Sequence, residues 1–336
     1  MNVLQTQFEE ITTLIQQTRY EALKTVNSQL IQLYWQVGCY IHERTTKDNW
    51  GKSVVTQLAQ FIAAKEPQTK GFSDKNLWRM KQFYEAYQGN LTHLDWVAQV
   101  PWTHNLLIFS KSKTIEERIF YLNLTIKERL GKRELERQID SACFERTMLA
   151  NQKLSPVVRE LPQDVTNIFR DTYIFDFLDL PENFNEKDLK KGLIGNLKKF
   201  ILELGNDFVF MGEEFRLQVG NKDFFIDLLF FHRDLQCLVS FELKITDFKP
   251  DFIGKLNFYL EALDRDVRKA HENPSIGVLL CKSKDEEIVE YAMSRNISPT
   301  LVADYETKFI DKKVLKQKFH QLLNDLSSSF EIDTPQ

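Results

Sequence analysis

The stretch Asp223–Leu260, DFFIDLLFFHRDLQCLVSFELKITDFKPDFIGKLNFYL, contains the pattern that decides the fold of the C-terminal half. Two apolar runs rich in β-branched and aromatic residues, Phe224–Phe231 and Leu235–Ile245, lie on either side of the short polar segment His232–Asp234. Runs of this length and composition, joined by a tight polar turn, are typical of two adjacent strands. The sequence therefore predicts a β-hairpin here.

Each of the two predicted strands contains charged residues where a buried strand normally has none. Asp227 lies in the first run, and Glu242 and Lys244 lie in the second. Because strand side chains alternate between faces, Glu242 and Lys244 share a face and Leu243 points to the other. One interpretation is a buried salt bridge from Lys244 to Glu242 or Asp227. Since taking a charge out of water costs several kcal/mol, three charges in apolar strands also favour a functional site.

The three charged residues are of the types that metal-assisted phosphodiester cleavage needs. Mg²⁺ (or Mn²⁺) prefers oxygen ligands and is usually held by one or two carboxylates together with water and substrate phosphate. Asp227 and Glu242 are therefore the candidate metal ligands. Lys244 would orient the attacking water and offset the charge that develops on the phosphorane. The pattern predicts a catalytic set of Asp227, Glu242 and Lys244.

Further short motifs occur in order along most of the chain. In the C-terminal half they are LELG at 202–205, DFFIDLLFFH at 223–232, ELK at 242–244, GKLNFYL at 254–260 and PSIGVLLC at 274–281. Upstream they are YWQVG at 34–38, WG at 50–51, GFS at 71–73, PWTH at 101–104 and YIFDFL at 173–178. Together these motifs resemble the YhcG family of the PD-(D/E)xK nuclease superfamily. The resemblance implies a helical, DNA-binding N-terminal domain and a C-terminal restriction-endonuclease-like domain.

The sequence departs from the family pattern at three positions close to the predicted site. Lys190 stands where the family tends to have Glu, Glu214 where it has Gln, and Lys255 where it has Gln. Related nucleases often take a third metal ligand from the first helix, and with Lys190 in that place Glu203 or Glu214 would have to supply it. Lys255 and Tyr259, one helical turn apart, are expected to contact the DNA backbone.

The departures favour an alternative in which the nuclease fold has weakened or lost its chemistry and serves as a DNA-binding or scaffold protein. A third option is a protein-interaction module built on the N-terminal helices. Residues 4–45 have helical periodicity and one apolar face, part of which is a candidate contact with another copy of the protein. Many enzymes of the superfamily dimerise to cut both strands, so the resemblance implies a homo-oligomer.

A helix-turn-helix pattern is predicted between residues 51 and 90. A helix from Gly51 to Lys65 ends before a proline, and Ser73 is well placed to cap a second helix. That helix has an apolar stripe of Leu77, Met80, Tyr84 and Tyr87, and its polar face carries the candidate DNA-binding residues Lys75, Asn76, Arg79 and Lys81. Arg and Asn can read base edges in the major groove, and Lys meets phosphate. An ordinary helical hairpin with a solvated basic face fits the same pattern.

The predicted fold class is mixed α/β (α+β), with a helical domain at 1–150 and a connector at 151–184. A nuclease-like domain follows at 185–310, and a helix with a mobile tail occupies 311–336. Within the nuclease-like domain we expect a helix at 186–204, strands near 207–211, 214–219, 223–231 and 235–245, a helix at 250–263 and a strand at 275–281. This α-β-β-β-α-β order is that of the restriction-endonuclease-like core. A helix at 284–295 and an edge strand at 301–303 complete the prediction.

Length and composition bound the remaining possibilities. The 336 residues suit two domains, and a net charge of −4 means that DNA contact would use local basic patches. Four cysteines, far apart in apolar sequence, are typical of reduced thiols in a cytoplasmic protein. No apolar run reaches the roughly 18 residues of a membrane span. Gly-rich phosphate loops, Gly-x-Ser-x-Gly and paired Cys/His motifs do not occur.

Overall fold

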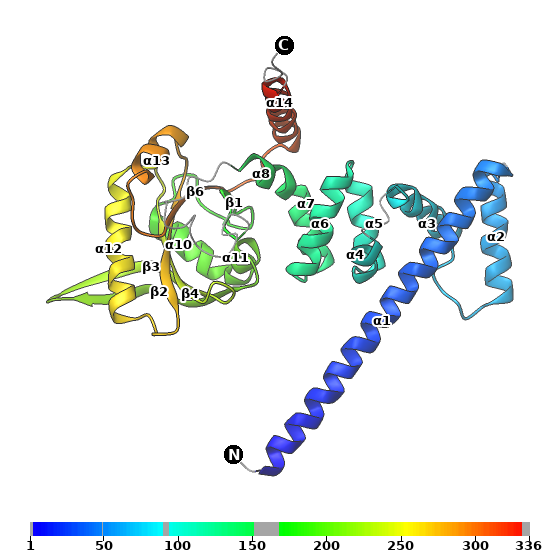
Figure 1. Ribbon diagram of the computed structural model, residues 1–336, viewed down its shortest axis with the longest axis horizontal. Coiled ribbons are helices and arrows are strands. Elements are labelled where there is room, and N and C mark those ends of the chain that lie inside the picture. Colours follow the sequence, from blue (N-terminus) through cyan, green and yellow to red (C-terminus); the bar gives the residue numbers. More distant parts are fainter. Residues whose placement is uncertain (1–2, 49, 90–93, 151–167, 331–336) are drawn as a thin grey trace. The chain divides into compact units, whose positions relative to one another are not determined.

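The computed structural model describes residues 3–48, 50–89, 94–150 and 168–330 of the chain. The chain forms two compact units, Met1–Ile139 and Asp140–Gln336 (Figure 1). Each unit has its own hydrophobic core. Of the helices in the described ranges, none combines the length and the apolar character that crossing a membrane requires.

The first unit is helical throughout its described residues. Its helices are α1 (Val3–Lys47), α2 (Lys52–Lys65), α3 (Asp74–Tyr87), α4 (Leu94–Gln99), α5 (Trp102–Lys111), α6 (Ile115–Lys127) and α7 (Lys132–Asp140). The C-terminal half of α1 packs on α3 and buries Tyr34 and Ile41. Gly38 permits this close approach, because a Cβ there would lie 2.2 Å from the backbone oxygen of Met80.

Helix α3 begins where the sequence predicts and differs in one residue of its buried stripe. The Ser73 side chain accepts a hydrogen bond from the backbone N–H of Asn76 at 3.3 Å. The buried side chains are Leu77, Met80, Phe83 and Tyr87. Phe83 replaces the predicted Tyr84 because Trp102 of α5 covers that side of the helix, with ring centroids 5.2 Å apart. The connector from α2 to α3 spans residues 66–73, longer than the about three to four residues of a helix-turn-helix.

The second unit is a six-stranded mixed sheet with helices on both faces (Figure 1). Its strands are β1 (Thr172–Ile174), β2 (Phe208–Val219), β3 (Lys222–His232), β4 (Cys237–Leu243), β5 (Asn273–Cys281) and β6 (Thr300–Glu306). Its helices are α8 (Cys143–Leu149), α10 (Glu186–Gly195), α11 (Leu197–Leu204), α12 (Asp251–Asp266), α13 (Glu286–Met293) and α14 (Lys312–Phe330). The strand order is β1-β6-β5-β4-β3-β2, parallel from β1 to β4 and antiparallel from β4 to β2.

The predicted order of helices and strands is present, with differences that have local causes. The two strands expected at 207–211 and 214–219 form one strand, β2, because a bulge between Phe210 and Gly212 lets pairing with β3 continue. The strand expected at the edge, 301–303, is β6, which lies between β5 and β1. β1 itself comes from the second half of the predicted connector, whose residues 151–167 lie outside the described ranges.

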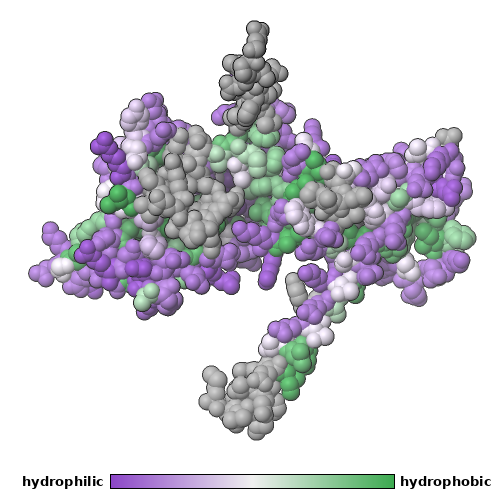
Figure 2. Space-filling view, viewed as in Figure 1, coloured by the Kyte–Doolittle hydropathy of each residue, from purple (hydrophilic) through white to green (hydrophobic). Residues whose placement is uncertain are grey.

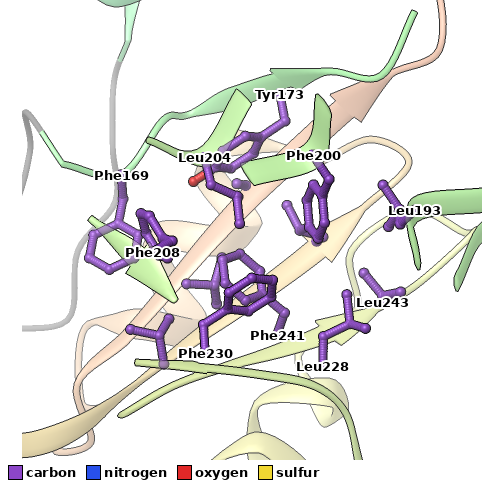
Figure 3. Close-up of a cluster of buried hydrophobic side chains, with 14 of the residues drawn as sticks. Phe169, Tyr173, Leu193, Phe200, Leu204, Phe208, Leu228, Phe230, Phe241 and Leu243 are labelled. Atoms are coloured by element: carbon purple, nitrogen blue, oxygen red, sulfur yellow. The ribbon is translucent and has the colours of Figure 1, made fainter. Parts of the chain in front are cut away.

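Apolar side chains pack against both faces of the sheet. On the face covered by α10 and α11, the Phe200 ring lies 5.8 Å from that of Phe230 and 6.3 Å from that of Phe241 (Figure 3). On the other face, Leu256 of α12 packs in a cluster with Leu279 of β5. Because side chains alternate along β4, Phe241 enters the first core and the next residue, Glu242, faces α12.

Candidate active site

Asp227 and Glu242 lie side by side on neighbouring strands. β3 and β4 are antiparallel with Leu228 opposite Phe241, so the adjacent positions are Asp227 and Glu242. The Asp227 Oδ2 accepts a hydrogen bond from the backbone N–H of Leu243 at 3.0 Å, which ties the two strands together at this level. The register of the predicted hairpin therefore brings the two candidate metal ligands together.

Glu242 is fully buried and is shared by two lysines. Its Oε1 accepts hydrogen bonds from the Nζ of Lys244 at 2.9 Å and from the Nζ of Lys255 at 2.5 Å. Its Oε2 is buried and has no hydrogen-bond partner within the described part of the chain. A buried polar atom without a partner costs about 1–3 kcal/mol, and a carboxylate oxygen of this kind is suited to coordinate a cation.

Lys244 is held as a cation by several acceptors. Besides Glu242, its Nζ donates to the backbone oxygen of Leu243 at 3.1 Å and lies 3.4 Å from Glu186 on α10. The ammonium also stands 5.5 Å from the centre of the Phe252 ring. Burial acts to lower the pKa of Lys244, but the hydrogen bond and charge of Glu242 outweigh it, so the pKa is raised. These contacts favour the positively charged form of Lys244.

A third lysine approaches Asp227 from α10. The Nζ of Lys190 lies 3.5 Å from Asp227 Oδ1 and donates to Glu214 Oε1 at 2.8 Å. Glu214 follows the bulge in β2 and has a φ of 46°, in the left-handed region that non-glycine residues seldom adopt. Burial acts to lower the pKa of Lys190, but its contacts with Glu214 and Asp227 raise it overall. Lys190 thus places an ammonium where a third acidic ligand was expected.

Lys255 and Tyr259 lie on the face of α12 that is turned toward the sheet. Lys255 is half exposed, and its ammonium stands 5.3 Å from the centre of the Tyr259 ring. Burial acts to lower the pKa of Lys255, and the hydrogen bond and charge of Glu242 raise it overall. Tyr259 is 3% exposed and packs among apolar side chains of β2, β3 and β4. Its contact with DNA stays a prediction.

Of the two glutamates considered as replacements for a third ligand, only Glu214 contacts this group of residues. Glu203 is buried elsewhere on α11, where its Oε1 lies 3.3 Å from Arg170 and 3.5 Å from Arg146. The same oxygen accepts from the backbone N–H of Ile174. Its role is to anchor β1 and the segment before it.

No three His, Cys, Asp or Glu side chains in the described ranges form a group that could hold a metal.

Two residues of the site were not predicted, Glu186 and Phe252. Both contact Lys244, and neither lies in the hairpin. Glu186 could have been found from its spacing, because it precedes Lys190 by four residues on one helix, and residues so spaced share a face. Phe252 carries no such signal, since its approach depends on how the loop after β4 leads into α12.

The predicted DNA-binding residues on α3 differ in how many contacts their side chains make within the protein. Lys75 is exposed, and Arg79 is partly exposed. The Nζ of Lys81 pairs with Glu85 at 2.8 Å and lies over the Trp78 ring. The side chain of Asn76 makes hydrogen bonds within the protein through both its oxygen and its nitrogen.

The Asn76 amide is bonded at both ends. Its Nδ2 donates to the backbone oxygen of Gly71 at 2.5 Å, and its Oδ1 accepts from the Trp102 indole at 3.0 Å. Both groups that would read a base are thus used to hold the start of α3 against α5.

Comparison with known proteins assigns both halves of the chain to described domains. Residues 166–322 match the YhcG PDDEXK nuclease domain, and residues 10–146 match the DUF1016 N-terminal domain. The chain is 30% identical to the Escherichia coli (strain K12) protein named "Putative nuclease YhcG", with 90% of each chain covered. The chain belongs to the YhcG family.

The YhcG assignment confirms the resemblance inferred from the motifs and the nuclease character of the C-terminal unit. Among solved structures, a repair endonuclease from Pyrococcus abyssi matches 35% of this chain and 50% of that chain, with 17% identity and a TM-score of 0.24. The matched nuclease domain contains every residue of the site described above.

Proposed function

We propose that this protein is a metal-dependent DNA endonuclease that hydrolyses phosphodiester bonds. The observation that supports the proposal most strongly is the meeting of Asp227, Glu242 and Lys244 at one point of a nuclease-type sheet. One oxygen of Glu242 is buried there and has no hydrogen-bond partner among the residues that the structure describes. A buried charge cluster of this kind is costly to maintain and is typical of a functional site.

The residues present fit one divalent cation, Mg²⁺ or Mn²⁺. The unpaired Glu242 Oε2 and the Asp227 carboxylate are hard oxygen donors, and substrate phosphate and water commonly complete such a set. When bound, the metal would supply Lewis-acid polarisation of the phosphoryl oxygen and a lowered pKa of water. Lys255 donates to the other oxygen of Glu242, Oε1, so its positive charge would stand close to a cation bound at Oε2 and would oppose its binding.

The lysines around the two carboxylates suit a phosphate substrate. Lys244 would orient the attacking water and offset negative charge on the phosphorane, because it is a fixed cation beside the ligands. Lys255 is half exposed and, once released from Glu242, would contact the DNA backbone as a point charge. Lys190 would remain with Glu214 and Asp227 and keep the Asp227 side chain in place.

The helical unit would locate the DNA. Lys75 and Arg79 on α3 are the side chains best placed to meet phosphate and bases, in a helix-turn-helix with an extended connector. By analogy with the superfamily, the protein would act as a homo-oligomer, in the cytoplasm, in genome defence or DNA processing. These parts of the proposal rest on the family and on local charge.

A second candidate is a nuclease-fold protein that binds DNA or other proteins with weakened or lost chemistry. The observation that favours it is the neutralisation of both carboxylates, Glu242 by Lys255 and Asp227 by Lys190. In this reading the three lysines and two carboxylates form a buried ionic network with a structural role, and the cation site is permanently blocked.

The two candidates are separated by a cleavage assay on the purified full chain. Supercoiled plasmid and linear single-stranded DNA are incubated with Mg²⁺, Mn²⁺ or EDTA, beside a Lys244→Ala variant. The nuclease proposal expects metal-dependent cutting that falls by at least about 100-fold in the variant, as when one electrostatic stabiliser is removed. Absence of cutting, with DNA retained at low salt, favours the second candidate.

A further inference from the structure

The N-terminal part of α1 has an apolar face that the first unit leaves uncovered. Every described side chain between residues 11 and 26 is exposed, including Ile11 at 56%, Ile15 at 52% and Val26 at 63%. The helix meets α4 at Asn27, whose Nδ2 donates to the backbone oxygen of Ala98 at 3.0 Å. Figure 2 shows hydrophobic surface, in green, on the part of α1 that extends past the other helices of this unit.

Most of the exposed apolar residues of this segment form one stripe, and Leu14 and Leu23, 62% and 69% exposed, flank it about 90° to either side of its centre. At about 100° per residue, Ile11, Ile15, Ala22 and Val26 fall within an arc of about 60°. Leu33 and Tyr40, further along the helix, fall in the same arc and are 42% and 50% exposed. We name Ile11, Ile15, Ala22, Val26 and Leu33 the α1 stripe and leave out Tyr40, whose ring contacts Trp50 and Arg44 of its own unit. The side chains that α1 buries in its own unit, Ile31, Tyr34 and Ile41, lie roughly 90–170° away. The helix therefore has two apolar faces, and one of them is free for another contact.

A helix of this composition needs a partner. In proteins, most helical stability comes from the packing of an apolar face, and ion pairs between successive turns add to it. Between residues 11 and 26 only Arg19, Glu21 and Lys24 are charged. With so few ion pairs available, burial of the stripe is the remaining source of stability for this part of α1.

The spacing of the stripe is symmetric under reversal. We propose that the α1 stripe pairs with the α1 stripe of a second copy of this chain in an antiparallel two-fold contact. Such a contact places two residues opposite each other when their numbers have a constant sum. A sum of 37 sets Ile11 opposite Val26 and Ile15 opposite Ala22, so that larger side chains meet smaller ones. The axis then passes between Thr18 and Arg19.

Size and charge are compatible with this pairing. The same register runs from residue 4 to residue 33, a length of about 45 Å, and the contact strip along a helix is about 10 Å wide. The buried surface is then about 450 Å² per copy and about 900 Å² in total, which is below the roughly 1,000 Å² of a stable specific interface and in the range of weak, transient contacts. The charged residues between 11 and 26 sum to +1, so repulsion between copies is small. We expect a dimer whose fraction rises with protein concentration.

Sedimentation of the full chain over a concentration series tests the contact. Ile15→Asp places a charge in the stripe, whereas Gln16→Asp adds the same charge one residue away, about 100° round the helix. The wild type and Gln16→Asp are expected to dimerise, and Ile15→Asp is expected to stay monomeric with unchanged helicity. A monomeric wild type at every concentration would overturn the proposal, and so would equal behaviour of the two variants.

Disulfide trapping fixes the direction of pairing. In a Cys39→Ser background, Thr18→Cys lies beside the two-fold axis, whereas the two copies of Thr25→Cys would be about 20 Å apart. Crosslinking at 18 and none at 25 supports the antiparallel register. Crosslinking at both indicates parallel pairing, and crosslinking at neither indicates another partner or another part of the same chain. Either of these two results overturns the proposal.

The dimer deepens the homo-oligomer of the proposed function but does not depend on the chemistry. If the chain is monomeric and still cuts DNA, the α1 contact is disproved and the nuclease proposal stands. If the chain forms a stripe-dependent dimer but cuts neither plasmid nor single-stranded DNA, the α1 contact stands and the nuclease proposal is disproved.

Discussion

The ammonium of Lys255 on α12 lies 2.5 Å from the Oε1 of Glu242 on β4, the carboxylate that the proposed chemistry needs for a metal. Lys255 is therefore an internal counter-ion whose charge would compete with a divalent cation for the same carboxylate. Since Glu242 is fully buried, the two positive charges would be weakly screened from each other. The strength of this repulsion would help to set the affinity of the proposed site for a metal.

Replacing Lys255 by Gln is expected to tighten binding of Mn²⁺ by about tenfold or more, because one like charge close to the cation is removed. Titration calorimetry on the purified chain measures the change. Lys249→Gln is the matched control, since Lys249 is exposed just before the same helix and the substitution removes the same charge. Equal affinities for wild type and Lys255→Gln would mean that Lys255 does not compete with the metal.

Asp227→Asn should abolish the thermal stabilisation that Mn²⁺ gives to the wild-type chain. The amide oxygen can still accept the hydrogen bond of Leu243, so the hairpin is retained while a charged metal ligand is lost. The melting temperature is measured with and without the cation. Asp223→Asn serves as control, because Asp223 is on the same strand and pairs with Arg216 at 2.9 Å, away from the site. If the Asp227→Asn variant gained the full wild-type shift, the metal would bind elsewhere.

The adjacent residues Lys75 and Asn76 should separate DNA contact from helix anchoring. Lys75→Ala is expected to leave stability unchanged, weaken DNA binding at every sequence and reduce the salt slope by about one. Asn76→Ala is expected to cost about 1–3 kcal/mol of unfolding free energy, because it leaves Gly71 and Trp102 without their partners. Filter binding over a salt series and chemical denaturation give the two readouts. A salt slope that Lys75→Ala leaves unchanged would move the DNA-binding face away from α3.

The site was predictable where it depends on one hairpin and was missed where it depends on packing. Asp227 and Glu242 meet because strand pairing and alternation are local rules that the sequence already contains. The contact from Lys255 to Glu242 depends instead on how α12 docks on the sheet. The same docking leaves Tyr259 only 3% exposed, which the family resemblance and the helix spacing did not indicate.

The fold shows the same division. β3, β4 and β5 were predicted because each has a long apolar run, whereas β2, which is interrupted by the polar segment 212–214, was predicted as two strands. β1 has three residues and becomes a strand only because β6 offers it a parallel edge, with Thr172 opposite Asp304. The single helix predicted at 186–204 is broken at Asn196, whose φ of −117° and two backbone bonds end α10 before α11 begins. The spacing of apolar residues does not reveal this break, because the helical periodicity continues on both sides of it.

Gly38→Ala should destabilise the first unit by at least about 1–3 kcal/mol, because the added methyl would collide with rigid backbone of α3 and push α1 away. Gly254→Ala is the control, since it also lies within a helix but a Cβ there meets nothing within 4 Å. That substitution should stabilise the second unit by about 0.5–1 kcal/mol through helix propensity. Chemical denaturation followed by hydrogen exchange assigns each change to its unit. Equal effects of the two substitutions would mean that α1 and α3 are not packed closely at Gly38, and that α1 buries a different face in the first unit.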